Sequence, residues 1–493
     1  MSRRPGFLPA GTGDDALQLV IPADLANQLD AHLFPGDGDE HGAVISAGIV
    51  RTSRGVRLLA REAFLAVDGV DFVPGSRAYR RLTPEFVNQH IRHCRDERMV
   101  YLAVHNHGGR GAVEFSEPDR RSHERGYPAL LDIAKGMPVG ALVLANDALA
   151  GDIWMPHGTR HAIGETVILG RNIERIYARP GAAPPDRAEI DDRQARIYGN
   201  AGQATLMRLK VGVIGAGGVG LPIVAALARL GVGHLVVVDP ERVDITNLPR
   251  LPESTRRDAM TWLTAAGRPA ALQRLGRRLA TPKVRLSKRV ARRARRGIVV
   301  DSLRGDIADA EIAQQLVDCD YLFLAADSHT ARSVFNALVH QYLIPGVQVG
   351  SHVAVGGDGE IGKIASIVRP VTPDHGCLWC NELIQPSKLT DESLPDTVRR
   401  AQRYLPMDDA PAPSVITLNA RGVADATDHF MLTVTGLLQP SDVDGDYRRY
   451  ETRTGKLTTS IPRRSADCRE CSIETSSIRA RGDEARLPVR QAP

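Results

Sequence analysis

Several short motifs of this 493-residue chain contain glycine, acidic, basic or metal-ligating side chains in patterns typical of binding and catalytic sites. The first is VGVIGAGGVG, in which an apolar run over 211–214 leads into Gly215, Gly217, Gly218 and Gly220. A buried strand followed by a GxGxxG turn predicts the close backbone approach that cradles the phosphates of a nucleotide. The alternative is a glycine turn with a purely structural role.

Two carboxylates follow apolar runs that we expect to be strands. The run over 234–238 ends at Asp239, a position that suits a carboxylate hydrogen-bonded to a ribose. The run over 321–326 ends at Asp327. At the carboxyl edge of a parallel sheet this second carboxylate could hold Mg²⁺ beside a triphosphate, or it could cap the helix that follows.

The kind of nucleotide is indicated by Asn247 and Arg250, which follow the first of these strands. Hydride transfer from a dinucleotide needs no cation at the phosphates. Attack on an α-phosphorus develops charge that cationic donors stabilise. The two side chains therefore favour ATP over NAD.

Four of the six cysteines form two CxxC pairs, Cys377 with Cys380 and Cys468 with Cys471. Paired CxxC motifs predict one tetrahedral, structural Zn²⁺ site. A redox dithiol is the alternative.

A second group of candidate metal ligands lies in the N-terminal third of the chain. His105 and His107 follow the apolar run 99–104, and two residues at i and i+2 of a strand face the same side. Ser116 and Asp119 come shortly afterwards. Two histidines and a carboxylate make three ligands with an open position for water, as in a catalytic zinc site. A solvated strand end followed by a helix N-terminus at Ser116 is the alternative.

The segment from about 191 to 438 resembles the ThiF/MoeB family, the ATP-dependent activators of ubiquitin-like proteins. The residues that carry the resemblance are Arg193, Gln194, Gly202, Gln203, the GAGGVG turn, Asp239, Asn247 to Arg250, and Asp327. The resemblance implies that Asp239 binds the ribose, that Asn247 and Arg250 bind the phosphates, and that Asp327 binds Mg²⁺. It also implies that Arg193 reaches the ATP of a partner subunit, and hence a homodimer.

The same resemblance implies a lysine at the ATP phosphates, for which Lys288 is the preferred candidate and Lys283 the competitor. The implied reaction is attack by the C-terminal carboxylate of a small protein on the α-phosphorus of ATP, giving an acyl-adenylate and pyrophosphate. Neither Cys94 nor Cys319 lies where this family keeps its thioester cysteine. We therefore expect transfer of the adenylate to a partner's cysteine or another nucleophile, without an internal thioester.

The N-terminal histidines and the SxxD segment are similar to the signature of the JAB/MPN (JAMM) metallopeptidases. The similarity implies that His105, His107 and Asp119 bind a catalytic Zn²⁺ and that Ser116 helps to stabilise an oxyanion. Glu40, just before the alternating run 43–50, becomes the candidate general base.

The expected fold class is α/β, with two catalytic parts. The predicted organisation is a disordered N-terminus (1–16), an α+β JAB/MPN-like domain (17–178), a linker (179–190), a Rossmann-like, doubly wound ThiF-type domain with a four-cysteine zinc site (191–455), and a C-terminal tail with the second CxxC pair (456–493). Residues after 476 are expected to fray.

A net charge of +5 and a basic run over 288–296 raise the question of nucleic acid. The scarcity of aromatic side chains, 4% of the chain, favours a solvated helical face instead. No apolar run is long enough to span a membrane and no secretory signal is present, so a cytoplasmic location is expected.

The function predicted from these residues is bifunctional: adenylation of a ubiquitin-like protein at its exposed C-terminus, and zinc-dependent cleavage of the linkage made there. A conjugating enzyme or another acceptor would be a further partner. Activation of a sulfur carrier for cofactor biosynthesis, or an ATP-sensing scaffold without catalysis, are the alternatives.

Overall fold

The computed structural model describes residues 17–73, 80–179, 181, 188–355, 360–394, 413–439, 446–473 and 476–490. The chain divides into two compact units. The first comprises 1–185, 340–343 and 469–486, and the second comprises 186–339, 344–468 and 487–493. The predicted disordered N-terminus and most of the predicted linker lie outside the described residues.

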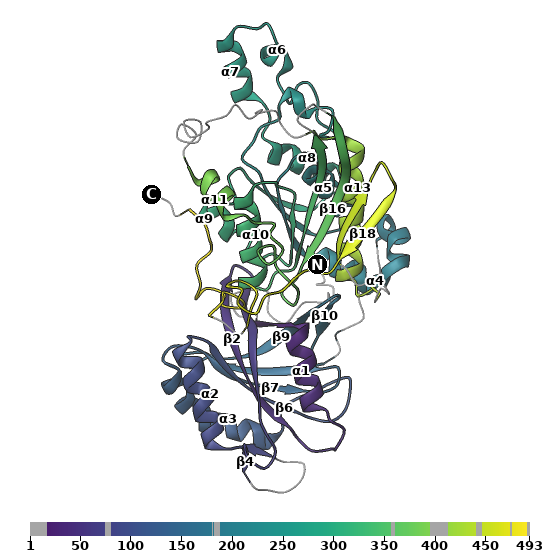
Figure 1. Ribbon diagram of the computed structural model, residues 1–493. Helices are drawn as coiled ribbons and strands as arrows, with labels where there is room; N and C mark the ends of the chain where they lie inside the picture. The colour runs from purple at the N-terminus through teal and green to yellow at the C-terminus, as the bar shows by residue number, and fades with distance from the viewer. Residues whose placement is uncertain are drawn as a thin grey trace. The chain divides into compact units, whose positions relative to one another are not determined.

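The first unit is built on an eight-stranded mixed sheet, purple and blue in Figure 1. Its strands are β1 (Leu17–Pro22), β2 (Gly42–Thr52), β3 (Gly55–Leu65), β6 (Val100–Asn106), β7 (Val139–Leu144), β8 (Leu149–Trp154), β9 (Arg160–Leu169) and β10 (Ile173–Ile176). The order is β1-β3-β2-β6-β7-β8-β9-β10, and β1 also pairs with β9. The sheet therefore closes on itself. The short strands β4 (Phe72–Val73) and β5 (Arg81–Leu82) pair separately.

Three helices cover this sheet. The first, α1 (Ala23–Leu33), buries Leu25, Leu29 and Leu33 at helical spacing and packs on β1, β3 and β9. The helices α2 (Pro84–Asp96) and α3 (Glu117–Ala134) pack against each other and on β6 and β7. This packing fixes the start of α3 near the end of β6, where the two histidines lie.

The segment 469–486 is an integral part of the first unit. Arg479 is 1% exposed, and its guanidinium donates to both carboxylate oxygens of Asp24 at 2.9 Å. Arg61 donates to the backbone carbonyls of Ser477 and Arg479. A Cβ at Gly48 would lie 2.0 Å from the carbonyl oxygen of Ala480, so β2 and this segment are in close backbone contact. The expectation that the chain frays after 476 is wrong for this segment.

The second unit contains another eight-stranded sheet, in the order β13-β12-β11-β14-β15-β16-β17-β18. Its strands are β11 (Lys210–Ile214), β12 (His234–Val238), β13 (Val299–Leu303), β14 (Tyr321–Leu324), β15 (Gly346–Val355), β16 (Ile361–Val371), β17 (Tyr447–Glu451) and β18 (Lys456–Ser460). The five strands from β13 to β15 are parallel, and the remaining three are antiparallel. Continuous apolar strands such as β11 fit this arrangement, because helices cover both faces of a parallel sheet.

Helices connect and cover these strands. They are α4 (Asp192–Arg208), α5 (Gly220–Leu230), α6 (Thr261–Thr264), α7 (Ala270–Leu279), α8 (Lys283–Ala294), α9 (Ala310–Gln314), α10 (His329–Gln341), α11 (Pro386–Ser393) and α13 (Ile416–Val434), with 3₁₀ turns η1 (Glu189–Asp191) and η2 (Ile245–Asn247). In the described residues, α5 packs on β11 and against α8, α8 packs on β12 and β13, and α13 packs on β15 and β16. The predicted α/β class is confirmed.

The connection from β12 to α8 is long, and it holds α6 and α7, which pack together (Figure 1). The connection ends at Lys283, where the basic helix α8 begins. The sequence indicates this helix only from residue 288. None of the helices in the described ranges combines the length and the apolar character needed to cross a bilayer.

Candidate functional site

The glycine-rich turn joins β11 to α5 and has little room for side chains. Gly215 has φ of 93°, and a Cβ there would lie 2.9 Å from the carbonyl carbon of Ala325. A Cβ at Gly220 would lie 1.8 Å from the carbonyl oxygen of Gly215. A Cβ at Gly217 would meet no atom within 4 Å. Glycine is therefore required for backbone packing at 215 and 220, while the turn is open at 217, where a ligand can approach its backbone.

Asp239 directly follows β12 and holds this turn in place. Its carboxylate accepts hydrogen bonds from the backbone N–H groups of Ala216 at 2.7 Å and Glu241 at 2.8 Å. Burial raises the pKa of Asp239, against the opposing effects of Lys283 and the two N–H groups. The predicted contact to a ribose stays a prediction.

A cavity of about 790 Å³ lies in the same region, and Asn247 and Arg250 line it. Their predicted contact with the ATP phosphates stays a prediction. A Cβ at Gly218 would lie 3.1 Å from the carbonyl oxygen of Arg250, so this arginine is next to the glycine-rich turn. Arg250 also donates from its guanidinium to the carbonyl of Thr246 at 3.1 Å. Further cations that sequence reasoning missed line the cavity: Arg242, Arg277 and Arg304.

The lysine of this cavity is Lys283, the competitor, and not the preferred Lys288. Lys283 is the first residue of α8, is 7% exposed, and its ammonium group pairs with Glu241. Lys288 lies one turn later and lines a separate cavity of about 430 Å³. The structure brings Lys283, and not Lys288, together with Asn247 and Arg250. Which lysine contacts the ATP phosphates stays a prediction.

The other two residues implied by the family resemblance have different surroundings. Ala325, which directly follows β14, lies against Gly215. Asp327 therefore comes two residues after the contact with the glycine-rich turn. Asp327 is exposed, and its charge acts on Arg332. Arg193 is exposed on α4 and does not line the cavity of its own chain. Close to it, Ile190 and Ile197 are 74% and 61% exposed.

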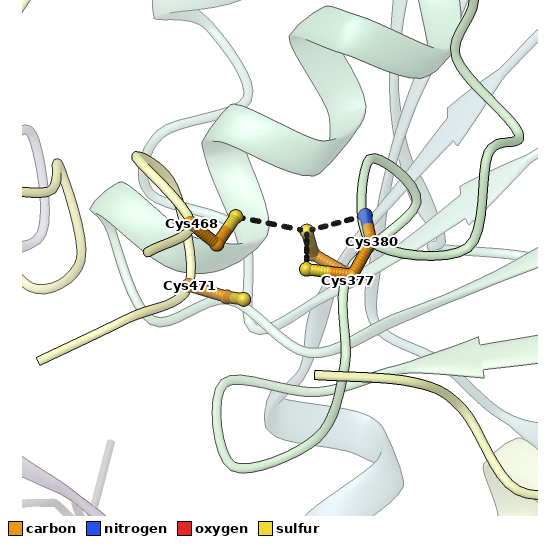
Figure 2. Close-up of side chains that lie close together, drawn as sticks. All are labelled: Cys377, Cys380, Cys468 and Cys471. Atoms are coloured by element: carbon orange, nitrogen blue, oxygen red, sulfur yellow. Dashed lines mark hydrogen bonds between the residues drawn. The ribbon is translucent and has the colours of Figure 1, made fainter. Parts of the chain in front are cut away.

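The four cysteines of the two CxxC pairs converge, as Figure 2 shows. All four sulfurs lie within 4.8 Å of one another, and the Sγ of Cys377 is 3.5 Å from those of Cys380 and Cys468. Thiolates placed ~2.3 Å from a zinc ion at the corners of a tetrahedron are about 3.8 Å apart. None of the four forms a disulfide. The arrangement fits a structural zinc ion.

The second candidate metal site belongs to the first unit. The Nε2 atoms of His105 and His107 lie 3.5 and 3.6 Å from the same carboxylate oxygen of Asp119. His105 stands on β6 and Asp119 on the first turn of α3. The Nε2 atom of His105 is buried and has no hydrogen-bond partner among the described residues. A buried, unsatisfied imidazole nitrogen facing a carboxylate fits a metal ion between them.

Ser116 and Glu40 complete this site. Ser116 is the N-cap of α3, and its hydroxyl donates to Asp119 at 2.6 Å. Burial favours the neutral carboxyl of Asp119, but His105 and Ser116 outweigh it and hold the pKa well below its usual range. Glu40 lies 3.8 Å from the Nε2 atom of His107, and burial raises its pKa. A raised pKa suits a group that must accept and later return a proton.

A cavity of about 700 Å³ adjoins these side chains. Glu40, His107 and Ser116 line it, together with Asn106, the last residue of α1, Leu33, and the loop that follows it. The Oδ1 atom of Asn106 accepts the backbone N–H of His41 at 2.6 Å, which fixes the segment next to Glu40. Sequence reasoning missed Asn106, although it stands between the two histidines.

Comparisons with known proteins found one family model, several curated relatives and several solved structures that resemble parts of this chain. Residues 192–402 match the model of the ThiF family. The SAMP-activating enzyme E1 of Haloferax volcanii is 26% identical over 199 residues, which cover 40% of this chain and 63% of that protein. The sulfur carrier protein adenylyltransferase of Thermus thermophilus is 43% identical over 60 residues, covering 12% of this chain and 22% of that protein. Among solved structures, E. coli MccB with ATP has a TM-score of 0.42 at 18% identity, over 58% of this chain and 75% of that one.

Residues 192–402 are thus a ThiF family domain, as the sequence resemblance indicates. The chain spans less than two thirds of the length of each of these two curated relatives. The JAB/MPN resemblance of the first unit stays a prediction.

Proposed function

We propose that the second unit adenylates the C-terminal carboxylate of a small protein of the ubiquitin-like or sulfur-carrier kind. The observation that carries the proposal is the cavity in which Asn247, Arg250 and Lys283 meet beside the glycine-rich turn, within the ThiF family domain. Two curated relatives are named as an activating enzyme and as an adenylyltransferase, which supports the same reaction class.

The reaction needs charge neutralisation more than it needs acid or base. The carboxylate oxygen forms a bond to the α-phosphorus of ATP, the bond from that phosphorus to the bridging oxygen breaks, and pyrophosphate leaves with its electron pair. Arg250 and Lys283 would stabilise the charge that develops on the phosphates. Mg²⁺, held by Asp327, would neutralise part of the triphosphate charge.

Arg193 would act in a homodimer. It is exposed and does not line the proposed nucleotide cavity of its own chain, as expected of a side chain that reaches the ATP of a partner subunit. The exposed side chains of Ile190 and Ile197 would be covered in such a dimer.

The acyl group would leave without forming an internal thioester. Cys94 and Cys319 are both fully buried, and burial raises the pKa of the Cys94 thiol to about 12. A thiol with so high a pKa is protonated near neutral pH and is a poor nucleophile. The remaining four cysteines would hold the structural zinc ion. The acyl-adenylate would therefore pass to a nucleophile of another molecule.

The first unit would be a zinc-dependent peptidase or isopeptidase acting at the C-terminus of the same small protein. His105, His107 and Asp119 would hold the ion, which would supply a water activated for attack on a carbonyl. Glu40 would accept the proton of that water, and Ser116 would keep Asp119 ionised and help to stabilise the oxyanion. Hydrolysis at that position yields the carboxylate that adenylation consumes.

The adenylation proposal is tested by exchange of labelled pyrophosphate into ATP in the presence of candidate carrier proteins. We expect Lys283→Ala to lower the exchange rate roughly 100-fold, since removing one donor from a charged transition state costs about that much. The loss should exceed that of Lys288→Ala. Arg292→Ala, an exposed change late in α8, is the matched control. No exchange with any carrier would support the ATP-sensing scaffold instead.

A sulfur-carrier role is the second candidate, supported by the relative from Thermus thermophilus. The two roles differ in the fate of the acyl-adenylate. Conversion to a thiocarboxylate by a sulfur donor would support sulfur transfer, and an amide bond to another protein would support conjugation. Mass spectrometry of the carrier separates the two outcomes.

A further inference from the structure

A second cavity of about 430 Å³ adjoins the proposed nucleotide cavity in the second unit. Arg242 and Arg304 line both cavities, so the two are neighbours. Arg285 and Lys288 complete the cationic lining of the second cavity, with Ser302 as a neutral polar group. No carboxylate is among its lining residues in the described part of the chain. The lining is therefore strongly positive.

These cations also differ from other cations of α8 in their partners. Arg289 makes a two-point contact with Asp258 at 2.8 and 2.9 Å, and Lys283 pairs with Glu241. Within the described ranges, Arg285 and Lys288 form no ion pair. Each is therefore available to an anion from solution.

Arg242 is held in place with its charge uncompensated. Its guanidinium donates to the carbonyl oxygen of Ala280 at 2.6 Å, which fixes the side chain without supplying negative charge. Partial burial and repulsion from Arg304, Arg285 and Arg278 lower the pKa of Arg242. An anion among these groups would relieve the repulsion.

The N-terminus of α8 adds to the positive electrostatic potential of the second cavity. This 12-residue helix begins at Lys283, and its N-cap residue Pro282 makes no side-chain hydrogen bond to the first turn. Pro282, Val284 and Arg285 all line the second cavity. A helix N-terminus carries a partial positive charge that favours anions, and phosphate is a common ligand there.

We propose that the second cavity binds a phosphate group of a ligand other than the ATP held in the first cavity. Guanidinium groups match the geometry of phosphate oxygens, and three arginines line this small cavity. Two sources share this chemistry: the pyrophosphate released by adenylation, and a phosphate of a second nucleotide. This proposal depends on the proposed function in one respect only, namely that the ligand of the first cavity is ATP.

The test is calorimetric titration of pyrophosphate into the full chain saturated with magnesium and the ATP analogue AMPCPP. We expect pyrophosphate to bind with the analogue in place, and Arg285→Glu to weaken it roughly tenfold or more, because a charge-assisted hydrogen bond is replaced by repulsion. Arg292→Glu makes the same charge change on an exposed residue of the same helix, outside both cavities. It should bind pyrophosphate within about twofold of the unchanged chain.

Two results would overturn the proposal: displacement of pyrophosphate by AMPCPP, or Arg285→Glu binding pyrophosphate as tightly as the unchanged chain. Adenosine 3′,5′-bisphosphate is titrated in parallel. If only the bisphosphate binds in a way that Arg285→Glu weakens, the phosphate comes from a second nucleotide. If only pyrophosphate binds in that way, the ligand is the pyrophosphate released by adenylation. If AMPCPP fails to bind, the nucleotide proposal fails, and the same titration without it still tests the second cavity. Melting temperatures of both variants show that they are folded.

Discussion

The two candidate metal sites of this protein differ in how many coordination positions the protein supplies. The cysteine site offers four sulfurs, which satisfy a tetrahedral ion and leave no position for water. The histidine site offers two imidazoles and one carboxylate, next to a cavity of about 700 Å³ that Glu40 also lines. The comparison teaches that ligand number and the adjoining space, rather than the presence of a metal, separate a structural site from one that can do chemistry.

The largest effect should come from Glu40→Gln. This change keeps the size of the side chain and the three metal ligands but removes the proton acceptor, and general-base catalysis contributes about 10²- to 10⁴-fold. We expect cleavage of a carrier with a C-terminal extension to fall by that factor while zinc content stays the same.

His107→Ala is the matched comparison for Glu40→Gln, since it should lose both zinc and cleavage. Pyrophosphate exchange should be unaffected in both variants, because His107 and Glu40 lie outside the proposed adenylation cavity. Full cleavage by Glu40→Gln would remove this glutamate from the mechanism.

Cys380→Ser should lower the stability of the fold and leave the rate of peptide cleavage unchanged. Loss of one thiolate from a closed zinc site removes binding energy that is also folding energy, so we expect a lower melting temperature and loss of one zinc ion per chain. Atomic absorption and thermal unfolding measure both. Cys94→Ser changes a buried cysteine outside the site and should keep the zinc. An unchanged zinc content in Cys380→Ser would contradict the structural assignment.

The smallest effect concerns the support of the histidine site. Asp152 accepts hydrogen bonds from His123 on α3 and from Arg160, and these outweigh burial and lower its pKa to about 2. The usual pKa is ~3.9, so its contribution to stability is complete above about pH 4 and is lost as pH falls towards 2.

Asp152→Asn should therefore be less stable than the unchanged chain near neutral pH, by about 1 to 3 kcal/mol. The difference should shrink below about pH 4. Urea unfolding at several pH values measures it. A difference that is independent of pH would show that the charge of Asp152 does not matter.

Much of the second unit is predictable from local pattern. The strand over 234–238 has the bounds expected, and the helix expected shortly after Asp327 begins at His329. Both are visible in the sequence because buried parallel strands and the helices that follow them form long apolar runs separated by turns. The choice between Lys283 and Lys288 was not predictable in this way. Both lie on α8, and only the path of the long connection from β12 decides which one enters the cavity.

The side chains that could bind metal or phosphate can be identified from the sequence alone, because ligand chemistry is a property of residue type and short spacing. The tertiary structure decided which distant groups meet. Arg277 lines the proposed nucleotide cavity from a helix with no recognisable motif. Arg479 is buried against Asp24, although a charged residue near the C-terminus is usually exposed. Such contacts depend on the packing of elements far apart in the chain, which local patterns of residues do not encode.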